Sequence, residues 1–222
     1  MRPELAGEQH LNFDQQDKLF DPKLARPVTV LGAGSVGSQV VQMLAQIGVT
    51  DLTVYDADDV ASHNICMSAF RISDLGRWKV EALADIVADK SGVQIKPIRR
   101  MWNGETLRGS VVCCVDSMDV RGAIWTKVRQ NPLVNIFVDT RIAKEFVAVY
   151  AIDPTNADHV ALYESRLYPS SEAVRPMCGE HGIIYVSSLA ACAATARLTQ
   201  SWKGGTTPPL FEMLVGSLHQ IT

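Results

Sequence analysis

The amino-acid sequence predicts an α/β fold: a doubly wound, mostly parallel sheet with helices on both faces and an antiparallel C-terminal extension. Short apolar runs rich in valine alternate with longer segments whose apolar residues recur at helical spacing. This alternation is typical of right-handed βαβ units, which build parallel sheets. Later in the chain, two strand-like runs are separated by too few residues for a crossover helix, so we expect them to pair antiparallel.

In the first half of the chain, local residue preferences mark where the predicted elements begin and end. Residues 1–26 are polar and are expected to form a helical lead-in that two prolines close. Gly48 is expected to end the first helix after it. Ser73 is expected to cap the second, in which apolar residues recur at i, i+3 and i+4. The expected strands span 28–31, 52–55 and 93–95, and the expected helices span 36–47 and 73–87.

In the second half, the same signals continue up to a long irregular segment. Asn131-Pro132 is expected to end a helix, and Asp139 to follow the next strand at its tip. Residues 153–182 lose periodicity, which indicates a crossover loop that is functional or mobile. Small residues in the last helix indicate close packing. The expected elements are strands at 111–115, 134–138 and 146–152, helices at 118–130 and 186–202, and a last strand-like stretch at 211–221.

Composition narrows the class of protein. The chain has 222 residues, of which 47% are hydrophobic, enough for one sizeable core, so we expect a single domain over 1–222. The formal net charge of −3 argues against a nucleic-acid binder, which usually has a basic stripe. We find no apolar run of about 20 residues that could span a membrane and no signal peptide, and therefore expect a cytoplasmic protein. The five cysteines include no CxxC pair, so a four-thiolate zinc site is not expected.

A glycine loop is the first motif that points to a ligand. Gly32-Ala33-Gly34-Ser35-Val36-Gly37 joins a predicted strand to a predicted helix, where backbone N–H groups and the helix N-terminus favour phosphate. Asp56 ends the second strand, where a carboxylate can accept hydrogen bonds from ribose hydroxyls. These residues predict a Rossmann-like nucleotide site. They fit ATP and NAD equally well, and a tight glycine turn without a ligand is the alternative.

Residues further along the chain separate these possibilities. After Asp56-Ala57-Asp58 come Asn64, then Lys79 at the start of a helix, and Asp116 after the fourth strand. In this order and spacing the chain resembles the E1-like adenylyltransferase family, which includes ubiquitin-activating enzymes and proteins of the ThiF, MoeB and HesA type. The resemblance covers about residues 28–121, and extends more weakly to 202.

The resemblance implies an ATP site with Mg²⁺ at the ends of the parallel strands. It implies that Lys79 neutralises the α-phosphate, that Asp116 holds the metal, and that Asn64 hydrogen-bonds to the nucleotide. Each residue also has a plainer reading. Lys79 can be a solvated helix residue, Asp116 a helix N-cap, and Asn64 a turn residue. The cofactor-binding set that the resemblance implies is Gly32, Gly34, Ser35, Gly37, Asp56, Asp58, Asn64 and Lys79.

The chain departs from the family pattern mainly in its cations. Family members usually have an arginine three residues after the asparagine, where this chain has Met67. Arg71 or Arg77 can supply that charge from the same loop, and we favour Arg71. The family's N-terminal arginine and its zinc cysteines have no counterpart here.

A candidate nucleophile comes from the crossover loop. Many relatives have a cysteine just before the last helix, and Cys178 stands there in this chain. The resemblance implies a thioester on this thiol, whose pKa a helix N-terminus would lower; a structural or inert cysteine is the alternative. The predicted catalytic set is thus Arg71, Lys79, Asp116 and Cys178. We expect the other cysteines, Cys66, Cys113, Cys114 and Cys192, to be packing residues. Asp139-Thr140-Arg141 is expected either to line a channel for the substrate's tail or to form a charged turn.

The function that the resemblance implies is ATP-dependent adenylation of the C-terminal carboxylate of a ubiquitin-like or sulfur-carrier protein. It also implies a homodimer and a downstream partner, either an E2-like or a sulfur-transfer enzyme. Three alternatives stay open: a tRNA-modifying relative that activates a small carboxylate, an NAD-dependent oxidoreductase, and a non-catalytic scaffold. An NAD-dependent oxidoreductase would explain the glycine loop and Asp56, but it offers no common function for Asn64, Lys79 and Asp116.

Overall fold

A single mixed sheet organises the chain. The computed structural model describes residues 11–172 and 182–221, and within them the strands form one eight-stranded sheet of order β3-β2-β1-β4-β5-β6-β7-β8. The pairs from β3 to β5 are parallel, and those from β5 to β8 are antiparallel. The predicted fold class is confirmed. The strands are β1 (Val28–Leu31), β2 (Leu52–Tyr55), β3 (Lys96–Ile98), β4 (Gly109–Cys113), β5 (Val134–Ala143), β6 (Phe146–Ile152), β7 (Leu210–Leu214) and β8 (His219–Gln220).

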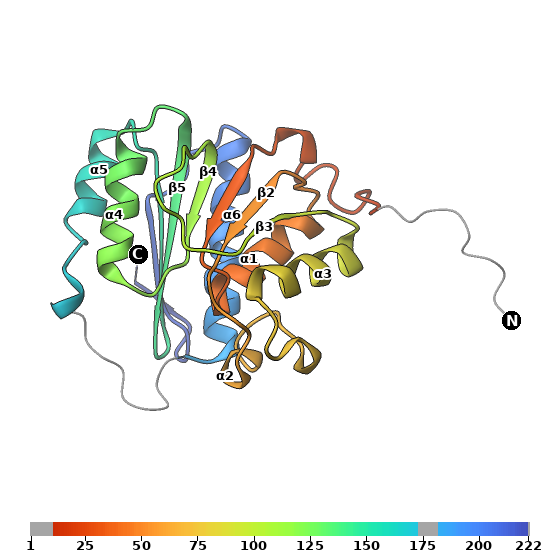
Figure 1. Cartoon of the computed structure of the whole chain (residues 1–222). Helices are drawn as coiled ribbons and strands as arrows, with labels where there is room; N and C mark the ends of the chain where they lie inside the picture. The colour runs from red at the N-terminus through yellow and green to blue at the C-terminus, as the bar shows by residue number, and fades with distance from the viewer. Residues whose placement is uncertain (1–10, 173–181, 222) are drawn as a thin grey trace, which may run out of the picture.

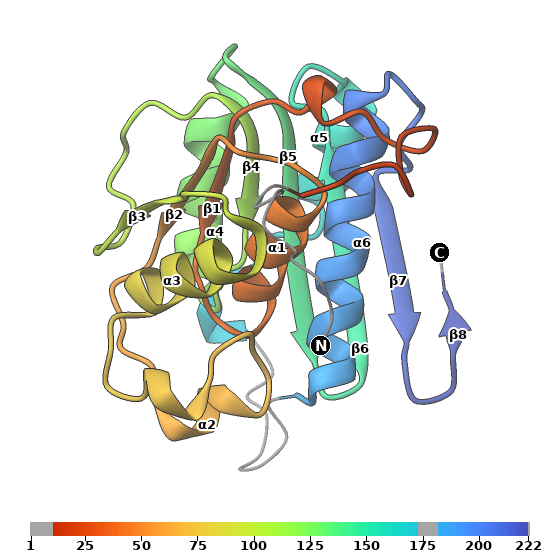
Figure 2. The same ribbon diagram turned by 90° about the vertical axis from the view of Figure 1, so that its right-hand side faces the viewer.

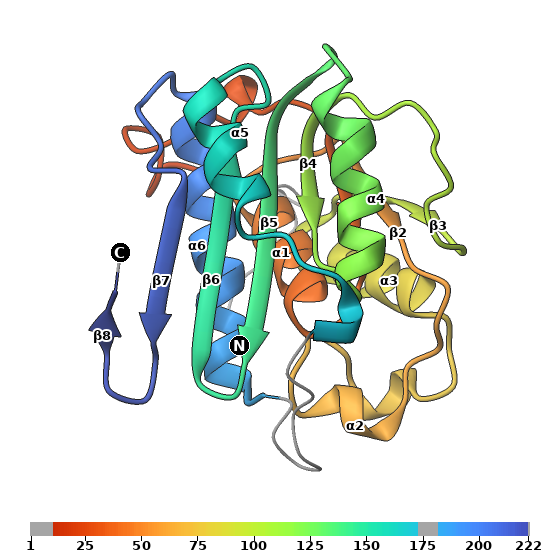
Figure 3. The same cartoon turned by 90° about the vertical axis from the view of Figure 1, so that its left-hand side faces the viewer.

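Helices cover both faces of the sheet. Figures 1 and 2 show α1, α3 and α6 on one face, and Figure 3 shows α4 and α5 on the other. The short helix α2 lies beyond the edge at which the parallel strands end. The helices are α1 (Ser35–Gln46), α2 (Ser62–Ile65), α3 (Lys79–Ser91), α4 (Met118–Arg129), α5 (Ala157–Glu164) and α6 (Ile184–Trp202), with 3-10 turns η1 (Pro22–Leu24), η2 (Ile72–Asp74) and η3 (Ser170–Glu172).

The alternation of side chains along β1 shows how the sheet builds two cores. Val28 and Val30 point to the face under α1, α3 and α6, whereas Leu31 points to the face under α4 and α5. All three side chains are at most 1% exposed. Burial on both faces is the usual arrangement for parallel strands and explains their nearly continuous apolar sequence.

Several predicted boundaries are wrong. The fourth strand spans Gly109–Cys113 and not 111–115, and three other boundaries differ for local reasons. The third strand lies at Lys96–Ile98 and not at 93–95, and it tolerates Pro97 because β3 is an edge strand. The helix expected from Ser73 begins at Lys79, because Gly76 takes a positive φ of 77° and the chain turns there. The fifth strand continues past Asp139 to Ala143, because β6 pairs with it along this length.

The ends of the chain also differ from expectation. Residues 11–26 form turns and η1, with no α-helix, where the sequence indicates a helical lead-in over 1–26. The crossover over 153–182 contains α5 and η3, while residues 173–181 lie outside the described part. The last stretch is a hairpin of β7 and β8 that extends the antiparallel part of the sheet.

Candidate functional site

The glycine loop lies between β1 and α1 and is shaped by close backbone packing. Gly32 has a φ of 96°, and a Cβ there would lie 2.8 Å from the carbonyl oxygen of Cys114. A Cβ at Gly37 would overlap the carbonyl oxygen of Gly32. At Gly34, by contrast, a Cβ would meet no atom within 4 Å. Two of the glycines are therefore required by the fold, and the third lies beside open space at the start of α1, where a phosphate group can approach.

Asp56 fixes the glycine loop to the end of β2. Its Oδ2 accepts a hydrogen bond from the N–H of Ala33 at 2.7 Å, and its Oδ1 accepts one from the N–H of Asp58 at 2.8 Å. The residue is 7% exposed. This carboxylate therefore organises the loop and the residues that follow β2.

Lys79 extends the same cluster. Its Nζ lies 2.7 Å from Oδ2 of Asp58 and 3.9 Å from Oδ1 of Asp56. The Lys79 side chain is 9% exposed and that of Asp58 is 70% exposed. Lys79 is therefore not a solvated residue on the outside of α3, and its ammonium group faces the glycine-loop cluster.

Asn64 belongs to the short helix α2, which follows Asp58 within a few residues in the sequence. Its Oδ1 accepts a hydrogen bond from the backbone N–H of Ala61 at 2.9 Å, which closes the turn before α2. Met67, which replaces the family's arginine, accepts hydrogen bonds at its carbonyl oxygen from Gln39 and Ser187. The backbone of Met67 thus joins this loop to α1 and α6, independently of the Met67 side chain.

The two arginines of this loop are both engaged in ion pairs. Arg71 contacts Asp74 at 3.1 Å and Asp89 at 3.3 Å, and Arg77 contacts Asp74 at 3.2 Å and Asp85 at 2.5 Å. Asp74 is 1% exposed. The structure therefore directs Arg71 toward α3, and its predicted role as the replacement cation remains a prediction.

Asp116 lies at the same edge of the sheet, just after β4. The Cys114 N–H donates to the carbonyl oxygen of Leu31 at the end of β1, which brings this segment beside the glycine loop. The alternative role of Asp116 as a helix cap is wrong, because Ser117 caps α4 by accepting a hydrogen bond from the N–H of Val120. Asp116 is exposed, and within 11–172 and 182–221 no hydrogen bond or ion pair involves its carboxylate. It is thus available to a cation.

The crossover is anchored to α4 next to Asp116. The side chain of Asp119 accepts from the N–H of Ser170 at 3.0 Å, and the N–H of Asp119 donates to Oγ of Ser170 at 3.0 Å. A shallow hollow of about 380 Å³ lies beside these two hydrogen bonds. It is lined by Met118, Asp119, Gly122, Leu167, Tyr168 and Pro169. There is therefore room for a ligand segment near the start of α4.

Of the two alternatives for Asp139-Thr140-Arg141, the charged turn is wrong, because these residues lie inside β5 and pair with β6. Asp139 is fully buried within β5, where Arg121, Arg141 and the hydroxyl of Tyr163 contact its carboxylate. Arg121 comes from α4 and Tyr163 from α5. These residues form a buried ionic cluster under α4 and α5, and at most Arg141, with 14% of its side chain exposed, can reach a channel.

The cysteines divide into two groups. Cys113 is buried and Cys114 half-buried, and burial raises the pKa of Cys114 to about 11 although Thr140 donates to its sulfur. Cys66 and Cys192 are exposed, so the expectation that they are packing residues is wrong for these two. Cys178, the predicted nucleophile, lies outside the described residues.

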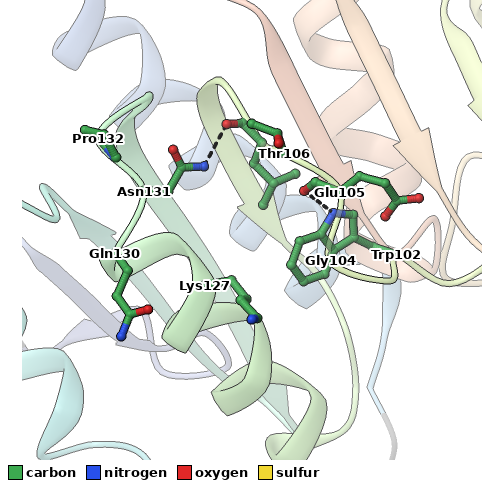
Figure 4. A pocket seen from close by; sticks show the side chains of 9 residues that line it. Trp102, Gly104, Glu105, Thr106, Lys127, Gln130, Asn131 and Pro132 are labelled. Atoms are coloured by element: carbon green, nitrogen blue, oxygen red, sulfur yellow. Dashed lines mark hydrogen bonds between the residues drawn. The ribbon is translucent and has the colours of Figure 1, made fainter.

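A second hollow lies away from the cluster. Figure 4 shows it between the loop after β3 and the end of α4, where Asn131 donates to the carbonyl oxygen of Leu107 and Trp102 to that of Glu105. Leu107 and Asn131 precede β4 and β5, so this hollow opens at the amino edge of the parallel strands. It is therefore not part of the candidate site.

Within 11–172 and 182–221, no group of three or more His, Cys, Asp or Glu side chains is arranged to hold a metal ion. In the same ranges, no helix has the length and apolar character needed to cross a membrane.

Sequence reasoning missed Gln39, which connects the site to α6. The Gln39 side chain is buried and donates to the carbonyl oxygens of Ser35 and Met67 and to Oγ of Ser187, and it accepts from Ser188. A glutamine among apolar residues in α1 was the available signal. It indicated no partner, because the partners lie far away in the sequence.

Comparison with known proteins agrees with this arrangement. Over 105 residues the chain is 34% identical to tRNA threonylcarbamoyladenosine dehydratase 2 of Saccharomyces cerevisiae, a match that covers 42% of this chain and 24% of that protein. Over 117 residues it is 30% identical to ubiquitin-like modifier-activating enzyme 5 of Caenorhabditis briggsae, covering 45% of this chain and 27% of that protein. The matches thus span about a quarter of the length of these relatives.

Solved structures share the fold over most of the chain. Escherichia coli MccB, solved with AMPCPP and MccA, superposes with a TM-score of 0.67 at 17% identity, covering 92% of this chain and 64% of that one. PaaA superposes with a TM-score of 0.68 at 14% identity, covering 90% and 64%. The model of the ThiF family matches residues 7–201. The chain therefore belongs to the ThiF family.

Proposed function

We propose that this chain activates a carboxylate by adenylation with ATP, and that the carboxylate is the C-terminus of a small protein or peptide. The observation that carries the proposal is the convergence at one sheet edge of the glycine loop, the Asp56–Asp58–Lys79 cluster and Asp116, whose carboxylate has no partner among the residues that the structure describes. This combination supplies phosphate-binding N–H groups, a cation and a free carboxylate within one site.

The chemistry has a simple balance. A carboxylate oxygen attacks the α-phosphorus of ATP, the bond from that phosphorus to the bridging oxygen breaks, and pyrophosphate leaves. Two anions must approach each other, so positive charge near the α-phosphate lowers the barrier. The ammonium group of Lys79 can provide this positive charge when it leaves the exposed carboxylate of Asp58 and pairs with the phosphate. Asp116 would hold Mg²⁺, which neutralises the leaving pyrophosphate.

The relatives support this reading of the substrate. One is named as a ubiquitin-like modifier-activating enzyme, and MccB has been solved with the ATP analogue AMPCPP together with MccA. The hollow beside the start of α4 would receive the substrate's tail. A homodimer and transfer of the activated group to Cys178 complete the proposal; for Cys178→Ala we expect adenylation to survive and any thiol-sensitive adduct to disappear.

A second candidate follows from other relatives. Two of them are named as tRNA threonylcarbamoyladenosine dehydratases, which favours activation of a small carboxylate on a nucleoside. The formal net charge of −3 disfavours a large polyanionic substrate. Both candidates need the same ATP site, so the choice between them concerns only the carboxylate.

The test is ATP–pyrophosphate exchange with candidate carrier proteins, peptides and modified tRNA as the second substrate. We expect exchange to depend on a protein or peptide with a free C-terminus and to fall by at least about 100-fold in Asp116→Asn, a loss of about 2.7 kcal/mol in barrier terms. Asp51→Asn is the matched control, because Asp51 is exposed at the opposite end of β2. Tight binding of NAD without binding of ATP would contradict the proposal, and exchange that depends only on tRNA would favour the second candidate.

A further inference from the structure

Arg99 and Trp78 form a cation–π pair beside the candidate site. The guanidinium carbon of Arg99 lies 3.1 Å from the centroid of the Trp78 ring. Arg99 is exposed, and within the described ranges no hydrogen bond or ion pair involves its guanidinium. A cation that lies on an aromatic ring is held in place by the ring while its N–H groups and its outer face stay free.

Backbone contacts place this pair next to the glycine-loop cluster. The N–H of Asp56 donates to the carbonyl oxygen of Ile98 at 3.2 Å, so Arg99 follows directly after the residue that Asp56 contacts. Trp78 bridges to Asp59 and immediately precedes Lys79. The cation–π pair therefore borders Asp56 on the side of β3, away from β1 and its glycine loop.

The order of the strands indicates which part of a nucleotide would lie next to Arg99 and Trp78. Phosphates bind at the glycine loop after β1, and ribose hydroxyls bind at the acidic residue after β2. The fragment beyond the ribose, toward β3, is the base. A free planar cation is a suitable surface for it, because bases stack on guanidinium planes.

The neighbouring arginine has a different environment. Arg100 forms an ion pair with Glu105, and its guanidinium lies 5.5 Å from the centroid of the Tyr55 ring. That pairing, together with the hydrogen bond from the N–H of Asn103 to Glu105, fixes the loop after β3. Arg100 therefore serves the loop, and Arg99 is the arginine left for a ligand.

We propose that Arg99, held against the ring of Trp78, forms the surface on which the base of the bound nucleotide stacks. The inference rests on the proposed function, because it takes the nucleotide to be ATP. It adds a residue that determines how the base is held, separately from the residues that hold the phosphates.

The test compares ATP with inorganic tripolyphosphate, which has the phosphates but no base. Calorimetric dissociation constants are measured in the presence of Mg²⁺ for the wild type, Arg99→Ala and Arg99→Lys. We expect ATP to bind about tenfold more weakly to both variants, equivalent to about 1.4 kcal/mol, because lysine keeps the charge but lacks the plane. The affinity for tripolyphosphate should stay unchanged.

Arg129→Ala is the matched control, since Arg129 is also exposed and pairs with Glu164 of α5, on the face of the sheet opposite α3 (Figure 3). Circular dichroism checks that each variant is folded. Equal weakening of ATP and tripolyphosphate would overturn the inference and make Arg99 a phosphate contact, and unchanged ATP binding would overturn it as well. A wild type that binds no ATP would instead refute the proposed function, and the inference with it.

Discussion

At the scale of single residues, the two glycines Gly34 and Gly37 show how one loop serves both fold and ligand. A methyl group at Gly37 would collide with the backbone at Gly32, while one at Gly34 would enter open space. Gly34 combines a φ of −76° with a ψ of −149°, which lies outside the regions that residues with a Cβ favour. Backbone packing therefore requires glycine at position 37, whereas at Gly34 the reasons for glycine are the backbone conformation and the space that an approaching phosphate needs.

We predict that alanine substitutions separate these roles. Gly37→Ala should destabilise the protein by about 3 kcal/mol or prevent folding, because backbone atoms cannot move aside cheaply. Gly34→Ala should cost only about 1 kcal/mol of stability, from a backbone conformation that alanine disfavours, and should weaken ATP binding at least tenfold, because its methyl group occupies the path of the phosphate. Thermal unfolding and calorimetry measure both effects. Equal loss of stability in the two variants would contradict this division.

Motif residues were the part of the site that sequence could predict. The glycine loop, Asp56 and Lys79 come together as expected, because each follows or begins an element whose position in a parallel sheet is known. Gln39 and Arg99 could not be predicted, since their contacts depend on how distant segments pack. Asp139 was misplaced because nothing local shows that its strand continues.

At the scale of elements, the segment from Asn64 to Trp78 is held against its neighbours by two polar networks. Gln39 of α1 joins the backbone of Met67 to Ser187 and Ser188 at the start of α6. Buried Asp74 joins η2 to Arg71 and Arg77, which also contact α3. Neither α2 nor η2 has a buried apolar residue, so these networks, together with the buried side chain of Phe70, hold the segment in place.

We predict that Gln39→Leu destabilises the protein by about 2–3 kcal/mol. Leucine has a similar size but leaves Ser188 and the carbonyl oxygens of Ser35 and Met67 without this partner in a buried region. Gln46→Leu, on the exposed end of the same helix, should change stability by no more than about 0.5 kcal/mol. Urea unfolding measures both. A stability of Gln39→Leu within 1 kcal/mol of the wild type would be inconsistent with the network.

Asp74 leads to a prediction about pH. Burial alone would raise the pKa of Asp74, but hydrogen bonds from Arg71 and the nearby charge of Arg77 outweigh it and lower the pKa. The stabilisation from this carboxylate is therefore complete above the unfolded pKa of about 3.9 and is lost as pH falls through the lower folded-state pKa.

For Asp74→Asn we accordingly expect a loss of about 2 kcal/mol at pH 7, in line with hydrogen bonds to a charged group. The difference from the wild type should narrow below about pH 4, measured by urea unfolding at a series of pH values. Asp89→Asn, in which an exposed partner of Arg71 is lost, should show little effect at any pH. A constant difference down to pH 2.5 would exclude titration of Asp74 as the cause.

Element types were predictable and their boundaries less so. The alternation of strands and helices in the sequence follows from burial on both faces of the sheet, which any sequence of this fold must satisfy. The end of β5 depends on its partner β6, and the start of α3 depends on a turn at Gly76 and the buried Asp74. These features arise from pairing and packing, which periodicity does not report.

At the scale of the whole molecule, the sheet changes character at β5. This strand pairs parallel with β4 and antiparallel with β6. Asp139 lies where strand pairing changes from parallel to antiparallel: it is in register with Cys113 of β4 and with Tyr150 of β6. Its carboxylate contacts Arg121 of α4 and Tyr163 of α5, so one buried cluster joins the parallel part of the sheet to its antiparallel extension.

We predict that Asp139→Ala destabilises the whole protein by about 3–5 kcal/mol, because two guanidinium groups then lack the buried carboxylate between them. The double variant Asp139→Leu/Arg121→Met should recover part of this loss, since it removes one cation together with the anion. Breaking the exposed Arg129–Glu164 pair with Arg129→Ala should cost no more than about 1 kcal/mol. Chemical unfolding followed by tryptophan fluorescence reports the cluster directly, because Trp125 packs against Tyr163 with ring centroids 4.8 Å apart. An Asp139→Ala variant that unfolds at the wild-type denaturant concentration would show that the two parts of the sheet are held together without this cluster.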